Sequence, residues 1–140
     1  ARAAGPSSTE GDALPSLDGM SVLVIDDEPM TREVIAVMLQ RCRAAVRVAD
    51  SACEGHARVA EQRPDAILCD IAMPGDDGYS FVRELRRSGP HIPVIALTAF
   101  GPTDDRNPAL EAGFDAYLKK PVDPVTLAVA VREVIGHGEG

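Results

Sequence analysis

The sequence predicts a doubly wound, three-layer α/β sandwich, in which helices cover both faces of a parallel sheet. The first observation is a series of short apolar runs, most of which lack the polar alternation of a half-exposed strand. The second is that helical patterns fall between these runs. Because crossovers between parallel strands are right-handed, this alternation builds a sheet between two helical layers. The expected strands are Val22–Ile25, Val46–Ala49, Ala66–Cys69, Val94–Leu97 and Ala116–Leu118.

The first two helices follow the first two strands. A stripe of apolar residues at i, i+4, i+7 and i+8 indicates an amphipathic first helix. Its members are Met30, Val34, Val37 and Met38. The stretch "SACE", Ser51–Glu54, is a capping box and predicts the start of a second helix.

Two further helices are expected near the third strand and at the end of the chain. The segment Gly78–Arg87 carries Phe81, Val82 and Leu85 on one face. Asp123 followed by Pro124 gives an N-cap and a proline at the first helical position of the last helix. The apolar face of this last helix is Leu127, Val131, Val134 and Ile135.

The two ends of the chain differ in composition from the region between them. Residues 1–16 are small, polar and rich in Pro and Gly, which is typical of a tether that cannot repay the entropy of ordering. We expect a flexible linker over residues 1–19, one domain over residues 20–136 and a disordered tail over residues 137–140.

Composition excludes several classes of function. Among the 140 residues no apolar run approaches the roughly 18 that a membrane span needs, so we expect no membrane contact by this segment. The net charge of −8 and the absence of a Lys/Arg cluster argue against nucleic acid as a partner. No signal peptide is recognisable, and the three cysteines lack metal-ligand spacing. These features indicate a reduced, cytoplasmic protein.

The polar side chains whose types could form a site follow the first, third, fourth and fifth expected strands. They are Asp26, Asp27 and Glu28 after the first strand, Asp70 after the third, Thr98 after the fourth, and Lys119 and Lys120 after the fifth. Parallel strands emerge at one edge of a sheet, where α/β proteins bind ligands. Crowded carboxylates repel one another, and oxygen ligands suit Mg²⁺. The set predicts a carboxylate nucleophile, a metal and a cradle for a phosphoryl group.

Four motifs at these strand ends carry a resemblance to a known family. They are "VLVIDDEP", "ILCDIAMPGDDG", "VIALTAF" and "AGFDAYLKKPVD". The chain resembles a response regulator receiver domain of two-component signalling, and most of all receivers at the C-terminal side of hybrid sensor histidine kinases. The resemblance covers about residues 20–136. It implies the flavodoxin-like receiver fold, with strand order 2-1-3-4-5 and five helices, and phosphoryl transfer from a histidine kinase or histidine phosphotransfer domain.

The resemblance also implies roles for individual residues. Asp70 matches the phosphoacceptor. Asp27 matches the carboxylate that binds Mg²⁺ directly, and Asp26 its neighbour that acts through metal-bound water. The main-chain carbonyl of Ala72 would complete the protein ligands.

A conformational switch is implied as well. Thr98 matches the hydroxyl that meets the phosphoryl oxygen, and Lys120 the lysine that pairs with it, with a cis peptide before Pro121. Tyr117 matches the aromatic residue that changes rotamer with Thr98. The fourth helix, fifth strand and fifth helix would then repack, and two receivers could dimerise through that face.

Two departures from the commoner receiver pattern affect mechanism. Ala72 and Phe100 stand where family members often carry polar groups that orient the attacking water, so we expect slow self-dephosphorylation. Pro108 lies where the fourth helix is expected, so that helix should start late, kink or shorten.

Other interpretations stay open on the residues alone. Taken singly, Asp26 or Glu28 is more simply a helix cap and Asp70 a turn residue. A phosphatase of the haloacid dehalogenase type would want a second acid where Ala72 stands, and "DDEP" would repel a flavin phosphate. A docking-only receiver is disfavoured because no site residue is missing. The leading tether favours the hybrid kinase, because it points to a segment upstream. A stand-alone response regulator is the alternative.

Overall fold

The computed structural model describes residues 15–71, 78–88, 91–98 and 113–139. Its sheet has five parallel strands in the order β2-β1-β3-β4-β5, which confirms the predicted strand order. The strands are β1 Ser21–Ile25, β2 Ala45–Ala49, β3 Ala66–Asp70, β4 Val94–Thr98 and β5 Ala116–Lys119. Each matches its expected run to within one residue at either end.

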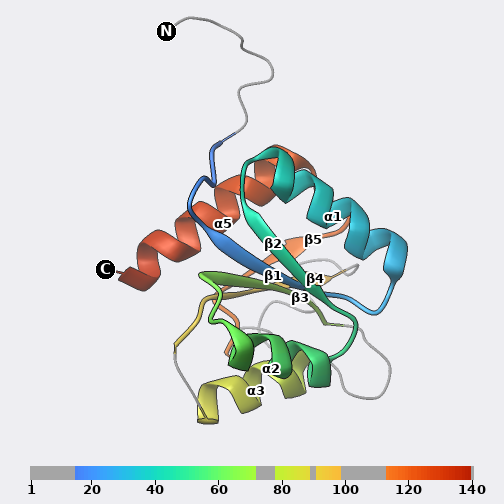
Figure 1. Ribbon diagram of the computed structural model, residues 1–140, viewed down its shortest axis with the longest axis vertical. Coiled ribbons are helices and arrows are strands. Elements are labelled where there is room, and N and C mark those ends of the chain that lie inside the picture. Colours follow the sequence, from blue (N-terminus) through green and yellow to red (C-terminus); the bar gives the residue numbers. More distant parts are fainter. Residues whose placement is uncertain (1–14, 72–77, 89–90, 99–112, 140) are drawn as a thin grey trace, which may run out of the picture.

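Helices lie on both faces of this sheet, as predicted. Helices α1 and α5 cover one face, and α2 and α3 cover the other (Figure 1). Their bounds are α1 Pro29–Arg41, α2 Ala52–Glu61, α3 Gly78–Ser88 and α5 Pro124–Glu139. The described part of the chain thus holds four helices. The helix expected between β4 and β5, with Pro108, falls in residues 99–112, which lie outside the described residues.

The central strands are buried on both sides, which explains why they lack polar alternation. In β1, Leu23 and Ile25 belong to the apolar core under α2 and α3. The alternate residues Val22 and Val24 belong to the core under α1 and α5. All four are fully buried. A strand with two apolar faces requires a helical layer on each side.

The apolar stripe that the sequence indicated on α1 is not the stripe that faces the sheet. The buried residues of α1 are Ile35, Ala36 and Leu39. Met30 is 76% exposed and Val34 50% exposed. The stripe predicted the helix correctly, but α1 carries apolar residues on two sides, and spacing alone does not say which side meets the sheet.

The expected caps of α2 and α5 are present. The Ser51 hydroxyl accepts a hydrogen bond from the Glu54 amide at 3.1 Å. Asp123 accepts from the Thr126 amide at 2.8 Å and from its hydroxyl at 2.9 Å. The hydrogen bond from the Thr126 amide lowers the pKa of Asp123 below its ordinary value. Both caps satisfy amides that the first helical turn leaves without a partner.

At the amino end of β4, an arginine of α3 ties three segments together. Arg86 donates to the Gly113 carbonyl at 3.0 Å, to the Ile92 carbonyl at 2.8 Å and to the Asp115 carboxylate at 2.7 Å. The same Asp115 oxygen accepts from the Val94 amide at 2.9 Å. We call Arg86 and Asp115 the amino-end clamp. In this clamp the guanidinium and the carboxylate form an ion pair with each other, and each also makes hydrogen bonds to the backbone.

Burial begins before residue 20, and helix α5 runs past residue 136. Leu17 is fully buried, and its amide donates to the Cys42 carbonyl at 2.6 Å, so the ordered chain begins before residue 20. Helix α5 continues to Glu139, past the expected end at residue 136. A helix already held by packing can add turns despite glycine, because only its nucleation is costly. No helix in the described ranges has the length and apolarity to cross a membrane.

Candidate functional site

The residues predicted to form a site come from the carboxyl ends of four neighbouring strands. Asp26 follows β1, Asp70 ends β3, Thr98 ends β4 and Lys120 follows β5. Asp26 is fully buried, and Asp70 and Thr98 are buried as well. Because the four strands lie side by side and parallel, these polar groups meet at one edge of the sheet.

Three carboxyl groups gather at this edge. Asp26, Asp27 and Asp70 each offer an oxygen, and the three oxygens lie within 4.8 Å of one another. Asp27 is exposed to solvent, unlike the other two. Three carboxylate oxygens at this spacing fit the preference of Mg²⁺ for hard oxygen ligands. We call Asp26, Asp27 and Asp70 the acidic cluster.

A lysine bridges the two buried members of the acidic cluster. The ammonium nitrogen of Lys120 lies 3.4 Å from an Asp26 oxygen and 3.3 Å from an Asp70 oxygen. The peptide bond that joins Lys120 to Pro121 is cis, as the resemblance implied. One ammonium group therefore contacts two of the three carboxyl groups, and both ion pairs are long for charge-assisted hydrogen bonds.

The protonation of Asp26 reflects this crowding. Burial raises the pKa of Asp26 above its ordinary value, and the nearby Asp70 raises it further. Two contacts oppose the rise: the hydrogen bond from the Glu28 amide, at 2.9 Å, and the charge of Lys120. Loss of water thus outweighs the contacts that favour the ionised form.

The other predicted site residues are partly placed. Tyr117 lies on β5, is half-buried and packs against the core under α2 and α3. Within the sheet, Tyr117 pairs with Ala96 of β4, two residues before Thr98. The Thr98 carbonyl accepts from the Lys120 amide at 2.7 Å, so the two strand ends are joined. Ala72 and Phe100 lie outside the described residues.

The family follows from a comparison with known proteins. A family model described as "Response regulator receiver domain" matches residues 22–132. The chain belongs to this family. An uncharacterized 14.6 kDa protein of Leptolyngbya boryana is similar to this receiver domain, with 38% identity over 122 residues that make up 86% of this chain and 93% of that protein.

Two further relatives have more informative names. The phosphate regulon transcriptional regulatory protein PhoB of Pseudomonas aeruginosa is 36% identical over 119 residues, which are 84% of this chain and 52% of PhoB. This receiver domain thus spans about half the length of PhoB. A solved structure with a similar fold is the receiver domain of sensor histidine kinase PA1611 from Pseudomonas aeruginosa, with 36% sequence identity and a TM-score of 0.77. The match covers 84% of this chain and 98% of the PA1611 chain. That structure is described as having a magnesium ion coordinated in the active site cleft.

One contact of the receiver site was not predicted from the sequence. Arg32 of α1 donates a hydrogen bond to the main-chain carbonyl of Asp26 at 2.9 Å. The one signal in the sequence is a basic residue close to the start of a helix, where the helix dipole disfavours positive charge.

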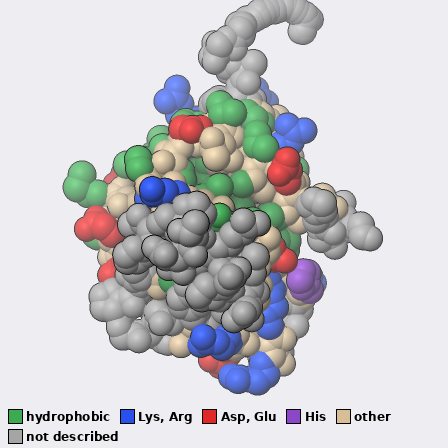
Figure 2. Space-filling model, turned by 180° about the vertical axis from the view of Figure 1, so that it is seen from behind, with side chains coloured by type: hydrophobic (Ala, Val, Ile, Leu, Met, Phe, Trp, Pro, Cys, Tyr) green, Lys and Arg blue, Asp and Glu red, His purple; other side chains and the backbone are tan. Residues whose placement is uncertain are grey.

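An apolar groove leads away from the site along α1. We define it by its lining residues, which are Met30, Thr31, Val34, Ile35, Met38, Lys120, Pro121 and Val122, and its volume is about 480 Å³. Lys120 thus belongs both to the groove and to the bridge between Asp26 and Asp70. Figure 2 shows hydrophobic side chains on the upper half of the molecule, which is the α1 and α5 side of the sheet in Figure 1.

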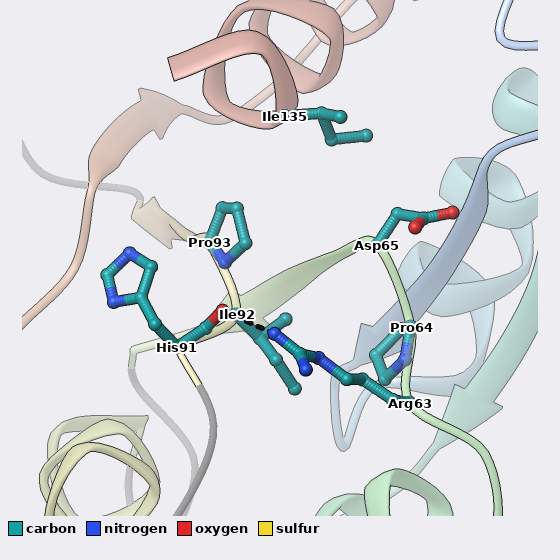
Figure 3. A pocket seen from close by; sticks show the side chains of 7 residues that line it. All are labelled: Arg63, Pro64, Asp65, His91, Ile92, Pro93 and Ile135. Atoms are coloured by element: carbon teal, nitrogen blue, oxygen red, sulfur yellow. Dashed lines mark hydrogen bonds between the residues drawn. The ribbon is translucent and has the colours of Figure 1, made fainter. Parts of the chain in front are cut away.

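A second hollow lies at the opposite end of the sheet. Its volume is about 200 Å³, and it is lined by Arg63, Pro64, Asp65, His91, Ile92, Pro93 and Ile135 (Figure 3). Arg63 donates to the His91 carbonyl at 3.0 Å. Asp65 accepts from the Ser21 amide at 2.7 Å. These two charged groups hold backbone segments together, which is a structural task rather than a sign of a ligand.

Proposed function

We propose that this receiver domain accepts a phosphoryl group from a phosphohistidine onto Asp70, with Mg²⁺ held by Asp26, Asp27 and Asp70. The observation that carries the proposal is the acidic cluster, whose three oxygens lie within 4.8 Å of one another. Lys120 lies 3.3 Å from Asp70 and supplies the positive charge that a phosphoryl group needs. The PA1611 receiver, described with magnesium in its cleft, supports the choice of metal.

The transfer is a displacement at phosphorus. An Asp70 oxygen forms a bond to phosphorus as the bond from phosphorus to the donor imidazole nitrogen breaks, and the electron pair stays on that nitrogen. Bound Mg²⁺ would neutralise charge on the carboxylates and on the incoming phosphoryl oxygens. The main-chain carbonyl of Ala72 is the proposed fourth protein ligand.

Lys120 and Thr98 are the proposed partners of the transferred group. In the unphosphorylated domain Lys120 is shared between Asp26 and Asp70, at 3.4 and 3.3 Å. Phosphorylation adds negative charge at Asp70, which draws the ammonium group toward the phosphoryl oxygens. The Thr98 hydroxyl would donate to another of these oxygens.

The proposed output is a local repacking that follows this movement. Tyr117 is half-buried on β5 and is proposed to change rotamer when Thr98 moves. The face formed by the fourth helix, β5 and α5 would then change shape and could serve as a dimerisation surface. Size exclusion of the domain with and without beryllofluoride, a phosphoryl mimic, tests this. An unchanged monomer in both states would contradict dimerisation.

The phosphohistidine donor is proposed to dock on the apolar groove of α1. Met30 and Val34 are 76% and 50% exposed, and the groove ends at Lys120, so a partner helix seated there could present its histidine to Asp70. Val34→Glu should slow transfer from a phosphorylated histidine protein by about tenfold, because buried interface contacts carry most of the binding energy. Transfer from acetyl phosphate should be unchanged.

Val48→Glu is the matched control, since Val48 is 38% exposed, lies on β2 and does not line the groove. Equal rates for wild type and Val34→Glu with the histidine donor would contradict docking there. Slowing with acetyl phosphate would show damage to the site itself.

The lifetime of the phosphorylated state is proposed to be long, because Ala72 and Phe100 offer no polar group to orient an attacking water. Phe100→Glu should shorten it. A wild-type lifetime of seconds, unchanged or lengthened by Phe100→Glu, would contradict this proposal.

The parent protein is proposed to be a hybrid sensor histidine kinase. Its receiver domain would lie in the cytoplasm, and an upstream part of the parent chain could be anchored in the membrane. The similarity to the receiver of sensor histidine kinase PA1611 supports this. A stand-alone regulator is the alternative, which the Leptolyngbya protein supports because the match covers 93% of its length. The full-length reading frame decides between the two.

The direct test of phosphorylation uses acetyl phosphate and Mg²⁺ with intact-mass detection. Wild type should gain the mass of one phosphoryl group, and Asp70→Asn should gain none. Asp65→Asn is the control, because Asp65 lies at the opposite end of the sheet (Figure 3). Equal labelling of wild type and Asp70→Asn would refute the proposal, and turnover of phosphomonoesters would favour a phosphatase.

A further inference from the structure

Arg32 is held where it can act on the acidic cluster through the main chain. Its amide donates to the Glu28 carbonyl at 2.9 Å, which fixes it at the end of the first turn of α1. From there its guanidinium donates to the Asp26 carbonyl at 2.9 Å, and this contact is partly buried. A positive charge this close to a helix start opposes the helix dipole, so the position calls for a compensating task.

The hydrogen bond from Arg32 completes the fixation of Asp26. The Asp26 amide donates to the Ala49 carbonyl at 3.1 Å, and its carboxylate accepts from the Glu28 amide at 2.9 Å. With Arg32 on the carbonyl, every polar group of Asp26 is engaged. The carbonyl of Asp26 belongs to the peptide that joins it to Asp27, so its orientation sets the position of Asp27.

Asp27 depends on this peptide more than its neighbours do. Asp26 and Asp70 are buried and share Lys120, whereas Asp27 is exposed. A flexible, exposed carboxylate binds a metal weakly unless its main chain is fixed, because ordering it on binding costs entropy.

We infer that Arg32 is a positioning residue for cation binding: by holding the Asp26 carbonyl it fixes the peptide that directs Asp27 toward Asp26 and Asp70. The inference rests on the proposed Mg²⁺ site. It assigns Arg32 no contact with metal or phosphoryl group, and its effect is on how tightly the metal is bound.

The sign of the effect separates positioning from simple charge. A guanidinium near the site repels Mg²⁺, so by charge alone its removal tightens Mg²⁺ binding. If Arg32 positions the ligands, its removal weakens binding, by about tenfold for the loss of one partner of a metal ligand. The two roles therefore predict opposite outcomes for the same substitution.

The experiment is a Mg²⁺ titration of the purified chain by calorimetry, without phosphodonor. Arg32→Met keeps the apolar stem of the side chain and removes both donor and charge. We expect its Kd for Mg²⁺ to rise about tenfold. Arg32→Lys, which keeps a charge and one donor, should recover part of this loss. Arg41→Met removes the same charge from the end of the same helix and should change Kd by less than twofold.

A second readout uses metal-free protein. The Glu28 amide donates to the Asp26 carboxylate, so its hydrogen exchange reports on the geometry of Asp26. Arg32→Met should speed exchange at Glu28, and Arg41→Met should not.

Unchanged or tighter Mg²⁺ binding by Arg32→Met, in a variant that unfolds like wild type, would overturn the inference. If Arg32→Met does not fold, Arg32→Lys decides: a Kd above that of wild type with faster exchange at Glu28 supports the inference, and a Kd equal to or below that of wild type despite faster exchange overturns it. Failure of wild type itself to bind Mg²⁺ would instead refute the proposed function.

Discussion

The two ends of the sheet hold charged clusters of opposite design. At the amino end, the Asp115 carboxylate meets the Arg86 guanidinium at 2.7 Å and a backbone amide at 2.9 Å. At the carboxyl end, Lys120 is shared between two buried acids at 3.3 and 3.4 Å, while Asp27 lies nearby. Short, complete contacts stabilise the fold, whereas the acidic cluster has more negative charge than its lysine balances.

The difference separates structural acids from functional ones. A carboxylate with a guanidinium and a backbone donor needs no further ligand. Three neighbouring carboxyl groups, of which one ammonium group contacts only two, keep an affinity for a cation. Breaking each cluster in turn should therefore produce different effects: loss of phosphorylation at one end and loss of stability at the other.

The largest effect should come from Lys120→Ala. Removing this ammonium group should slow phosphorylation by acetyl phosphate by about 100-fold, because it removes a fixed positive charge from the site of transfer. The rate of mass gain at saturating Mg²⁺ measures this. A rate within twofold of wild type would mean that Lys120 balances the acids and takes no part in transfer.

At the other end, Arg86→Ala should lower the free energy of unfolding by about 2 kcal/mol, since it removes three hydrogen bonds of a half-buried cation. Urea denaturation measures the loss. The folded fraction of the variant should be phosphorylated by acetyl phosphate at the same rate as wild type. A variant of normal stability with slow phosphorylation would reverse the roles assigned to the two ends.

Asp26→Asn should raise the free energy of unfolding, whereas Arg86→Ala lowers it, and the change should be smaller. The reason is that the substitution relieves repulsion in the acidic cluster. Without Mg²⁺ the variant should be more stable than wild type by about 0.5–2 kcal/mol at neutral pH. The raised pKa of Asp26 means that its protonated form stabilises the fold. That contribution is fully present below the ordinary pKa of 3.8 and is lost as pH rises through the folded value.

The gain from Asp26→Asn should therefore shrink as pH is lowered from neutrality toward 4. Urea denaturation at a series of pH values, each with and without Mg²⁺, follows this. A gain that grows toward low pH would contradict the direction of the pKa shift.

The two ends also differ in how far the sequence predicted them. Asp26, Asp70, Thr98 and Lys120 were predicted to meet because residues after parallel strands share an edge, which requires no knowledge of packing. The pairing of Arg86 with Asp115 joins residues of α3 and the turn before β5 that no motif links. Contacts of this kind depend on how a helix is rotated against the sheet.

The outer face of α1 shows the same limit. Apolar spacing predicted a helix there but did not show that Met30 and Val34 are exposed while Ile35 and Leu39 are buried. A lone Leu17 in a polar segment gave no sign that the ordered chain begins there, because its burial depends on a core cluster that includes α1 and α5 residues far along the sequence.

The most direct test of the account is whether Mg²⁺ stabilises the domain through the acidic cluster alone. At free Mg²⁺ ten times its Kd, wild type should gain about 1.4 kcal/mol in the free energy of unfolding. Asp115→Asn, at the amino-end clamp, should start from lower stability and show the same gain. Asp27→Asn should lose most of it. An equal gain in wild type and Asp27→Asn would contradict a metal site built from Asp26, Asp27 and Asp70.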